Sequence, residues 1–190
     1  MHPGHELRAA VLGGRAHMLK IAGRLYEGML RAMMAAASLY VALMMLGIVY
    51  YTAFRALGWR YDPYTFPFIE YGFIYVLMLG GPWLVRTRGH IHIELLTAAV
   101  PERMRKVLSR TVAVLCVLTC LALAWYTGVL TVSDFTNNVY DELRAQLDIK
   151  RWIVTVSMPI GFGLMGIEFL RYVFGRELLH TGKAGLAGEG

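Results

Sequence analysis

Histidine is the residue type in this chain best suited to hold a haem or a metal ion. The chain has six histidines, which are His2, His5, His17, His90, His92 and His180. A haem bound within a membrane helix bundle needs axial imidazoles inside the apolar helices, but all six lie outside the long apolar segments. On a helix, residues two positions apart such as His90 and His92 point in different directions, and the sequence identifies no further ligand. We therefore expect no cofactor and no metal site.

Two cysteines could in principle carry redox chemistry. Cys116 and Cys120 lie four residues apart within one apolar segment, so they share a face of a helix. Their backbone separation and their place inside the segment make them poor candidates for a disulfide with each other. We interpret them as small packing residues between helices.

Two acidic residues lie inside apolar segments, where an ionisable group is by default a functional candidate. Glu70 and Glu168 each lie about one turn from the end of their segment. Glu168 has Arg171 three residues on, which is a helical spacing for an ion pair. We favour structural pairing or a subunit contact over proton or ion coupling. The sequence contains no nucleophile–base set and no glycine-rich phosphate loop, so we expect no enzymatic activity.

The apolar segments that position these residues predict a membrane protein. Of the 190 residues, 57% are hydrophobic and 17% are charged, against about 25% charged in a soluble domain. Two segments contain no Lys, Arg, Asp or Glu over 23 residues each, enough to cross a hydrocarbon core of about 30 Å. With two further segments, the sequence predicts an all-α integral membrane protein with four transmembrane helices. The four spans are residues 32–54, 67–85, 111–133 and 152–174.

The distribution of basic residues predicts the orientation. Of the 19 Lys and Arg residues, 14 lie before the first span, between spans two and three, or after Glu168. By the positive-inside rule, both termini and the middle loop are then cytoplasmic. The basic residues are not gathered on one folded face, which argues against nucleic-acid binding.

The flanking regions form two predicted cytoplasmic parts. In residues 1–31, apolar side chains recur at helical spacing opposite a polar row, which favours an amphipathic helix lying on the inner leaflet. The apolar set is Met18, Ile21, Leu25 and Met29, and the polar row is Lys20, Arg24, Glu27 and Arg31. Glycines weaken this helix, so an unstructured basic leader stays open as the alternative. Residues 175–190 are predicted to be a cytoplasmic tail with a disordered end.

Proline and glycine positions give further predictions about the helices. Pro101 followed by Glu102 is typical of a helix start, and nothing breaks the helix from there to Ser133. The Gly80-Gly81-Pro82 run inside span two predicts a kink or a close helix contact. Small residues in spans one and four permit close helix approach, either to a partner or within the chain. The small residues are Ala32, Ala35, Ala36, Ser38, Ala42, Gly161, Gly163 and Gly166.

Two stretches after span two carry a family resemblance. Residues 80–96 read GGPWLVRTRGHIHIELL and residues 100–105 read VPERMR. This resembles the small membrane subunit of tripartite ATP-independent periplasmic (TRAP) transporters, the DctQ-like family, with Glu94 where Asp is commoner and Val100 in place of Leu. A weaker similarity covers residues 147–152 and 158–162, with Lys150 where Pro is frequent. The positions that carry the resemblance are Arg86, Gly89, His90, Glu94, Pro101, Arg105, Pro159 and Gly161.

The resemblance implies a function that the chain does not perform alone. Such a subunit works with a large TRAP membrane subunit and a periplasmic solute-binding protein in the bacterial inner membrane. These systems take up organic anions, often carboxylates, driven by a cation gradient. In the family, the large subunit is the carrier and the small one is its scaffold.

The segment from Arg86 to Glu94 is the best candidate for a structural device. Gly89 can end span two in a left-handed cap, and His90 and Glu94 with nearby arginines would then fasten the turn at the inner leaflet. We expect this segment to shape the fold or the large-subunit contact without touching substrate. Glu70, Pro101, Arg105, Pro159, Gly161 and Glu168 are further candidates for structural or interface roles.

Two other functions are compatible with a small membrane protein of four transmembrane helices. A proton-coupled carrier or exporter that acts as a homo-oligomer would need Glu70 as its coupling residue. A membrane anchor for a redox enzyme would need histidines inside the spans, and their positions disfavour it.

Overall fold

The computed structural model describes residues 4–59, 64–87, 101–141 and 148–175, with the backbone alone at residues 4–16, 19, 102 and 105. These residues form α1 (Gly4–Ala56), α2 (Thr65–Arg86), α4 (Glu102–Thr136), α5 (Arg151–Thr155) and α6 (Ser157–Phe174). The structure contains four helical segments long and apolar enough to cross a membrane, the last formed by α5 and α6 together. The described part of the chain has no strand, so the predicted all-α membrane fold with four spans is confirmed.

The predicted bounds of the first three spans lie inside α1, α2 and α4. Helix α4 begins at Glu102, directly after Pro101, as the proline predicted. It continues three residues beyond Ser133, to Thr136. Gly80, Gly81 and Pro82 lie inside α2 and are buried, and α2 continues through them to Arg86.

The fourth span differs from the prediction because it is interrupted at Val156, between α5 and α6. Pro159 supplies the physical reason: it has no N–H to donate to the Thr155 carbonyl, and its ring crowds that carbonyl. The Ser157 hydroxyl donates to the carbonyl of Val154 at 3.0 Å. A side chain therefore satisfies one of the backbone groups that the interruption affects.

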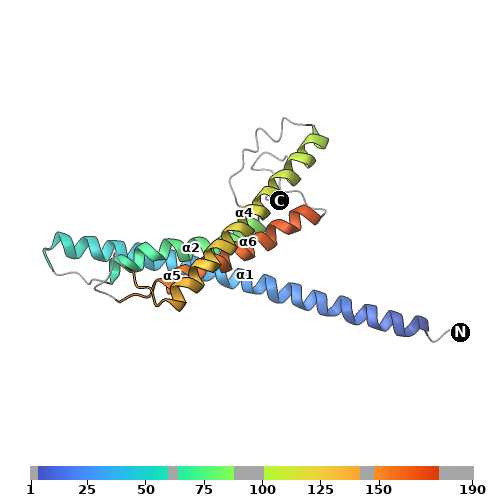
Figure 1. Cartoon of the computed structure of the whole chain (residues 1–190), viewed down its shortest axis with the longest axis horizontal. Coiled ribbons are helices and arrows are strands. Elements are labelled where there is room, and N and C mark those ends of the chain that lie inside the picture. The colour runs from blue at the N-terminus through green and yellow to red at the C-terminus, as the bar shows by residue number, and fades with distance from the viewer. Residues whose placement is uncertain (1–3, 60–63, 88–100, 142–147, 176–190) are drawn as a thin grey trace.

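The helices form an open layer in which contacts follow the order α1, α2, α6, α4. Figure 1 shows them crossing near the middle and diverging toward the start of α1 and the start of α4. Helix α2 packs against both α1 and α6, and α4 packs along α6. The main core lies where α2, α4 and α6 meet. It consists of Met78, Val85, Ala113, Val117, Cys120, Met165, Phe169 and Tyr172. Cys120 thus has the packing role that its spacing predicted.

Helix α1 joins this layer along one stripe. Its buried residues Leu30, Ala37 and Met44 are seven positions apart, so they follow one face of the helix. It is the least buried of the four spans. Most of its apolar surface therefore needs lipid or another protein to cover it.

Glycines allow the backbones of α2 and α6 to approach each other closely. A Cβ atom added at Gly161 would lie 2.7 Å from the Met78 Cβ and 2.9 Å from its Cα. One added at Gly81 would lie 2.8 Å from the Met165 Sδ. A Cβ added at Gly166 would make an ordinary contact of 3.5 Å with the Cys120 Cβ, whereas Gly163 has no neighbour within 4 Å. Gly161 thus packs within the chain, which was one of the two interpretations left open for the small residues of span four. Gly81 makes a close helix contact, which was one of the two predictions for the Gly80-Gly81-Pro82 run.

The predicted interfacial helix is not separated from the first span, because α1 is continuous through Arg31. Its amphipathic sequence is helical, but its position on a membrane surface stays a prediction. The predicted tail lies outside the described residues, except for Gly175.

Candidate functional site

A carboxylate is buried at the end of the layer where α1, α2 and α6 meet. The side chain of Glu168 on α6 is 0% exposed. Its Oε2 accepts a hydrogen bond from Arg171 Nη1 at 2.9 Å, and its Oε1 accepts one from Arg86 Nη1 at 3.3 Å. A buried charge is tolerated only when it is paired and hydrogen-bonded. Both oxygens of Glu168 meet that condition.

Further ion pairs connect Glu168, through Arg86, to side chains of α1. Arg86 Nη2 lies 3.4 Å from Glu27 Oε2, and Glu27 Oε1 lies 2.5 Å from Arg31 Nη2. Positive and negative groups therefore alternate from Arg31 through Glu27, Arg86 and Glu168 to Arg171. We call these five residues the Glu168 network. It joins three helices at what we call the Arg86 end of the layer.

Aromatic side chains surround the Glu168 network. The guanidinium of Arg86 lies 5.8 Å from the Tyr26 ring centroid, and that of Arg31 lies 5.8 Å from the Trp83 ring centroid. The Tyr172 hydroxyl donates to the carbonyls of Val85 at 2.9 Å and Arg86 at 3.0 Å. These carbonyls belong to the last turn of α2, where the regular i+4 donors are missing, and the Val85 carbonyl also accepts from the Thr87 N–H. Tyr172 therefore fastens the end of α2 to α6.

A second buried acid lies at the opposite end of the layer. Asp134 on α4 is 1% exposed, and its carboxylate accepts hydrogen bonds from Arg151 Nε at 2.9 Å and Arg151 Nη2. This is the two-bonded arrangement that favours Arg over Lys. The pair joins the end of α4 to the start of α5. We call this the Asp134 end.

The connection between α4 and α5 places Arg151 for this contact. Tyr140 and Lys150 form an antiparallel bridge, and the Arg151 amide donates to the Val139 carbonyl at 3.0 Å. Asn138 and Asp148, both with φ of +48°, adopt left-handed conformations that Asn and Asp tolerate better than most residues. The Tyr71 hydroxyl of α2 donates to Asp141, so the connection is also held to a third helix.

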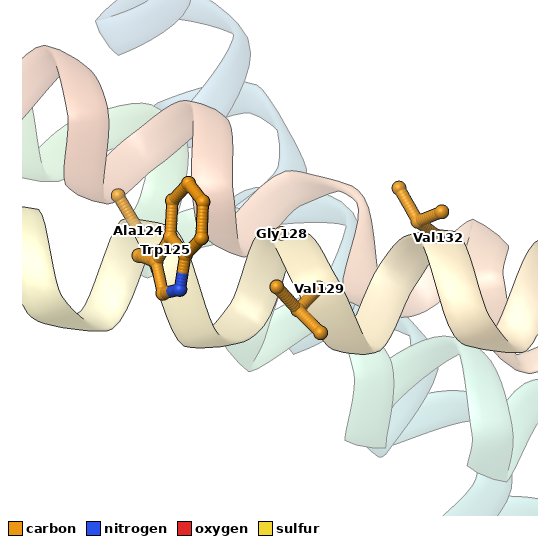
Figure 2. Close-up of a pocket in the computed structure, with 5 residues that line it drawn as sticks. All are labelled: Ala124, Trp125, Gly128, Val129 and Val132. Carbon is orange, nitrogen blue, oxygen red and sulfur yellow. The ribbon is translucent and has the colours of Figure 1, made fainter.

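A shallow groove of about 390 Å³ follows α4 (Figure 2). It is lined by Ala124, Trp125, Gly128, Val129 and Val132. This lining carries no charge, so it suits a lipid chain or an apolar helix and offers nothing to a charged solute. Among the described residues, no three His, Cys, Asp or Glu side chains come together as a metal site.

Comparison with known proteins assigns this membrane layer to a family. The model of the family described as "Tripartite ATP-independent periplasmic transporters, DctQ component" matches residues 44–178, which is more than half of the chain. The chain belongs to the DctQ family. It is a small multi-pass membrane subunit of a TRAP transporter, as the motifs after span two predicted.

One relative of the DctQ chain is the C4-dicarboxylate TRAP transporter small permease protein DctQ of Pseudomonas aeruginosa. The two are 28% identical over 104 residues, which is 51% of this chain and 46% of the relative. The matching part thus spans about half the length of this relative. No solved structure matches the chain.

The structure brings together two of the residues predicted for the DctQ site. Arg86 and Glu168, which are 82 positions apart, form an ion pair. Glu70 is exposed and lies in the second turn of α2, about 24 Å from Arg86 at the helical rise. Pro159 packs 3.8 Å from the position of a Cβ at Gly128.

The remaining predicted residues give less information. Pro101 occupies the N-cap position of α4, and the side chain of Arg105 is not described. Gly89, His90 and Glu94 lie outside the described residues. The turn at the inner leaflet that we expected His90 and Glu94 to stabilise therefore stays a prediction. A role at a subunit interface stays a prediction for all ten candidates.

Sequence reasoning missed the Asp134–Arg151 pair and the contact of Tyr172 with α2. The signal for the first was present, because an acid directly follows the charge-free segment of span three and a base directly precedes span four. Nothing in the local sequence points to the second, since Tyr172 and Val85 are 87 positions apart.

Proposed function

We propose that this DctQ chain is the scaffold of a large TRAP carrier subunit in the bacterial inner membrane. The assembly takes up an organic anion such as a carboxylate, driven by a cation gradient, with a periplasmic solute-binding protein supplying the substrate. The name of the Pseudomonas aeruginosa relative, a C4-dicarboxylate transporter component, supports a dicarboxylate as the substrate class.

The observation that carries the scaffold role is the pairing of the buried acids. Glu168 is held by Arg86 and Arg171, and Asp134 is held by Arg151. Carboxylates paired on both oxygens are committed to holding helices together. A group that couples transport must instead release and rebind its ion as the protein changes conformation.

The open arrangement of the helices supports the same role. An alternating-access carrier commonly has two repeats and broken helices around a polar site at the midplane. In the described part of this chain, α1, α2, α6 and α4 lie side by side, and the groove on α4 is apolar. A flat layer of this kind has two broad apolar faces. We assign one to lipid and the other to the helices of the large subunit.

The same proposal includes the orientation. The positive-inside rule places the Arg86 end, with both termini, in the cytoplasm and the Asp134 end in the periplasm. The periplasmic solute-binding protein then meets the assembly on the side of the connection between α4 and α5.

Complex formation tests this scaffold role. An affinity-tagged chain is expressed together with the large TRAP subunit of the same organism and purified in mild detergent. We expect the two proteins to co-purify and to elute together from a sizing column. If the chain elutes only with copies of itself while the large subunit is present and folded, the scaffold proposal is wrong.

A further inference from the structure

The first half of α1 extends beyond every other helix at the Arg86 end (Figure 1). The last described contacts of α1 at this end involve Tyr26, Glu27 and Leu30, which lie against the end of α2 or are buried. From His17 to Leu25, every side chain that the structure describes is exposed. Nothing in the described chain covers this part of α1.

The length of α1 places this part outside the hydrocarbon core. Its 53 residues extend about 80 Å, against a core of about 30 Å. The charge-free residues 32–54 are enough to cross that core. Arg31 and Glu27 at one end and Arg55 at the other hold this register, because charged groups stay at the membrane boundary. Residues 4–31 therefore lie outside the core.

This outer part has one apolar side, and it is exposed. Met18, Ile21 and Leu25 recur at spacings of three and four residues, so they share one face of the helix. They are 65%, 43% and 70% exposed, respectively. Large apolar side chains in this arrangement favour burial against an apolar surface.

Basic residues flank the apolar face. At 100° per residue, Lys20 and Arg24 lie about 100° and 60° around the helix from Ile21, and both are exposed. Glu27 is already engaged by Arg86 and Arg31. Among the described side chains from His17 to Leu25, the formal charges are those of Lys20 and Arg24, which complement anionic lipid headgroups.

We propose that the part of α1 before Tyr26 binds the anionic surface of the membrane that α1 itself enters. Met18, Ile21 and Leu25 insert between the lipid chains, and Lys20 and Arg24 contact lipid phosphates. Gly28 lies between this part and the charge-free span and is the position at which α1 can turn from the span to the surface. A Cβ there would have no neighbour within 4 Å, so packing does not require the glycine, and a glycine weakens the helix locally.

Nitroxide accessibility in the full chain tests this proposal. In a Cys116→Ala, Cys120→Ala background, single spin labels are introduced by Ile21→Cys and by Lys20→Cys, with Leu46→Cys as the lipid-facing reference. The chain is reconstituted without partners in nanodiscs of phosphatidylcholine, with or without phosphatidylglycerol. Collisions with oxygen report lipid, and collisions with a water-soluble nickel chelate report water.

We expect the oxygen-to-nickel ratio at position 21 to match that at position 46 and to exceed that at position 20. We also expect phosphatidylglycerol to raise the ratio at position 21. Equal access of the nickel chelate to positions 20 and 21 in both lipids would overturn the proposal. A label at position 21 that leaves water only when the large subunit is added would overturn it in favour of a protein partner. An unchanged ratio on adding phosphatidylglycerol would overturn the assignment of Lys20 and Arg24 to lipid phosphates. Because the chain is tested without partners, none of these results depends on the scaffold proposal.

Discussion

Glu168 on α6 and Arg86 at the end of α2 form an ion pair with 3.3 Å between Oε1 and Nη1, and the carboxylate is fully buried. The pair joins two helices that are distant in sequence. Because Arg86 also contacts Glu27, the same guanidinium connects α1 to the layer. The Glu168 network is therefore the electrostatic link among α1, α2 and α6 in this DctQ chain.

The substitution Glu168→Gln should destabilise the chain by about 3 kcal/mol, because it leaves Arg86 and Arg171 without their shared counter-charge. The free energy of unfolding in mixed detergent micelles measures this. Asp148→Asn makes the corresponding acid-to-amide change at an exposed position and should stay within about 0.5 kcal/mol of the parent. Equal effects of the two substitutions would contradict the structural role of Glu168.

At the Asp134 end, Asp134→Asn should cost about 1–2 kcal/mol, because two hydrogen bonds to a buried carboxylate are lost while the half-exposed Arg151 can turn to water. The control is Asp148→Asn, an exposed position whose left-handed backbone suits Asn. A double-mutant cycle with Arg151→Gln measures the coupling. The double variant should lose less than the sum of the two single variants, and strict additivity would mean that the pair contributes nothing.

Tyr172→Phe removes one hydroxyl without changing the ring. It should lower the free energy of unfolding by about 1–2 kcal/mol, because two carbonyls at the end of α2 lose this donor. Tyr126→Phe, at an exposed position of α4, is the matched change and should have little effect. Amide hydrogen exchange should also rise in the last turn of α2 in the Tyr172 variant. Unchanged protection there would argue against the contact.

Two glycines two residues apart on α6 should respond in opposite ways to the same substitution. Gly161→Ala places a Cβ against the Met78 backbone and should destabilise the packing of α2 on α6 by about 1–3 kcal/mol. Gly163→Ala meets no neighbour within 4 Å and should stabilise the helix by up to about 1 kcal/mol. Thermal unfolding of the two purified variants compares them. A loss of stability in both would mean that Gly163 also has a packing role.

Local features of the fold were predictable from the sequence because their causes are local. Charge-free segments of membrane length predicted the positions of α1 and α4, an apolar segment with Glu70 near its start predicted that of α2, and Pro101 predicted the start of α4. The interruption at Val156 also has a local cause, the proline at 159, but the apolar character of the whole segment obscured it. Hydropathy reports that a segment spans the membrane and does not report where its backbone hydrogen bonds break.

The candidate site was predictable only in part, because its contacts link distant segments. The spacing of Glu168 and Arg171 indicates a pair on one helix. Its extension to Arg86 and Glu27 depends on how α6, α2 and α1 are arranged, and no local pattern encodes that order. The contact of Tyr172 with α2 could not be predicted either. Its acceptors are backbone carbonyls, which every residue type has, so the sequence of α2 does not indicate the contact.

Transport in reconstituted liposomes tests the central claim most directly. Liposomes contain this chain alone, the large TRAP subunit alone, or both, and the solute-binding protein and radiolabelled succinate are added under an imposed cation gradient. We predict accumulation of succinate only when both membrane subunits and the solute-binding protein are present. Accumulation in liposomes that hold this chain alone would contradict its role as a scaffold.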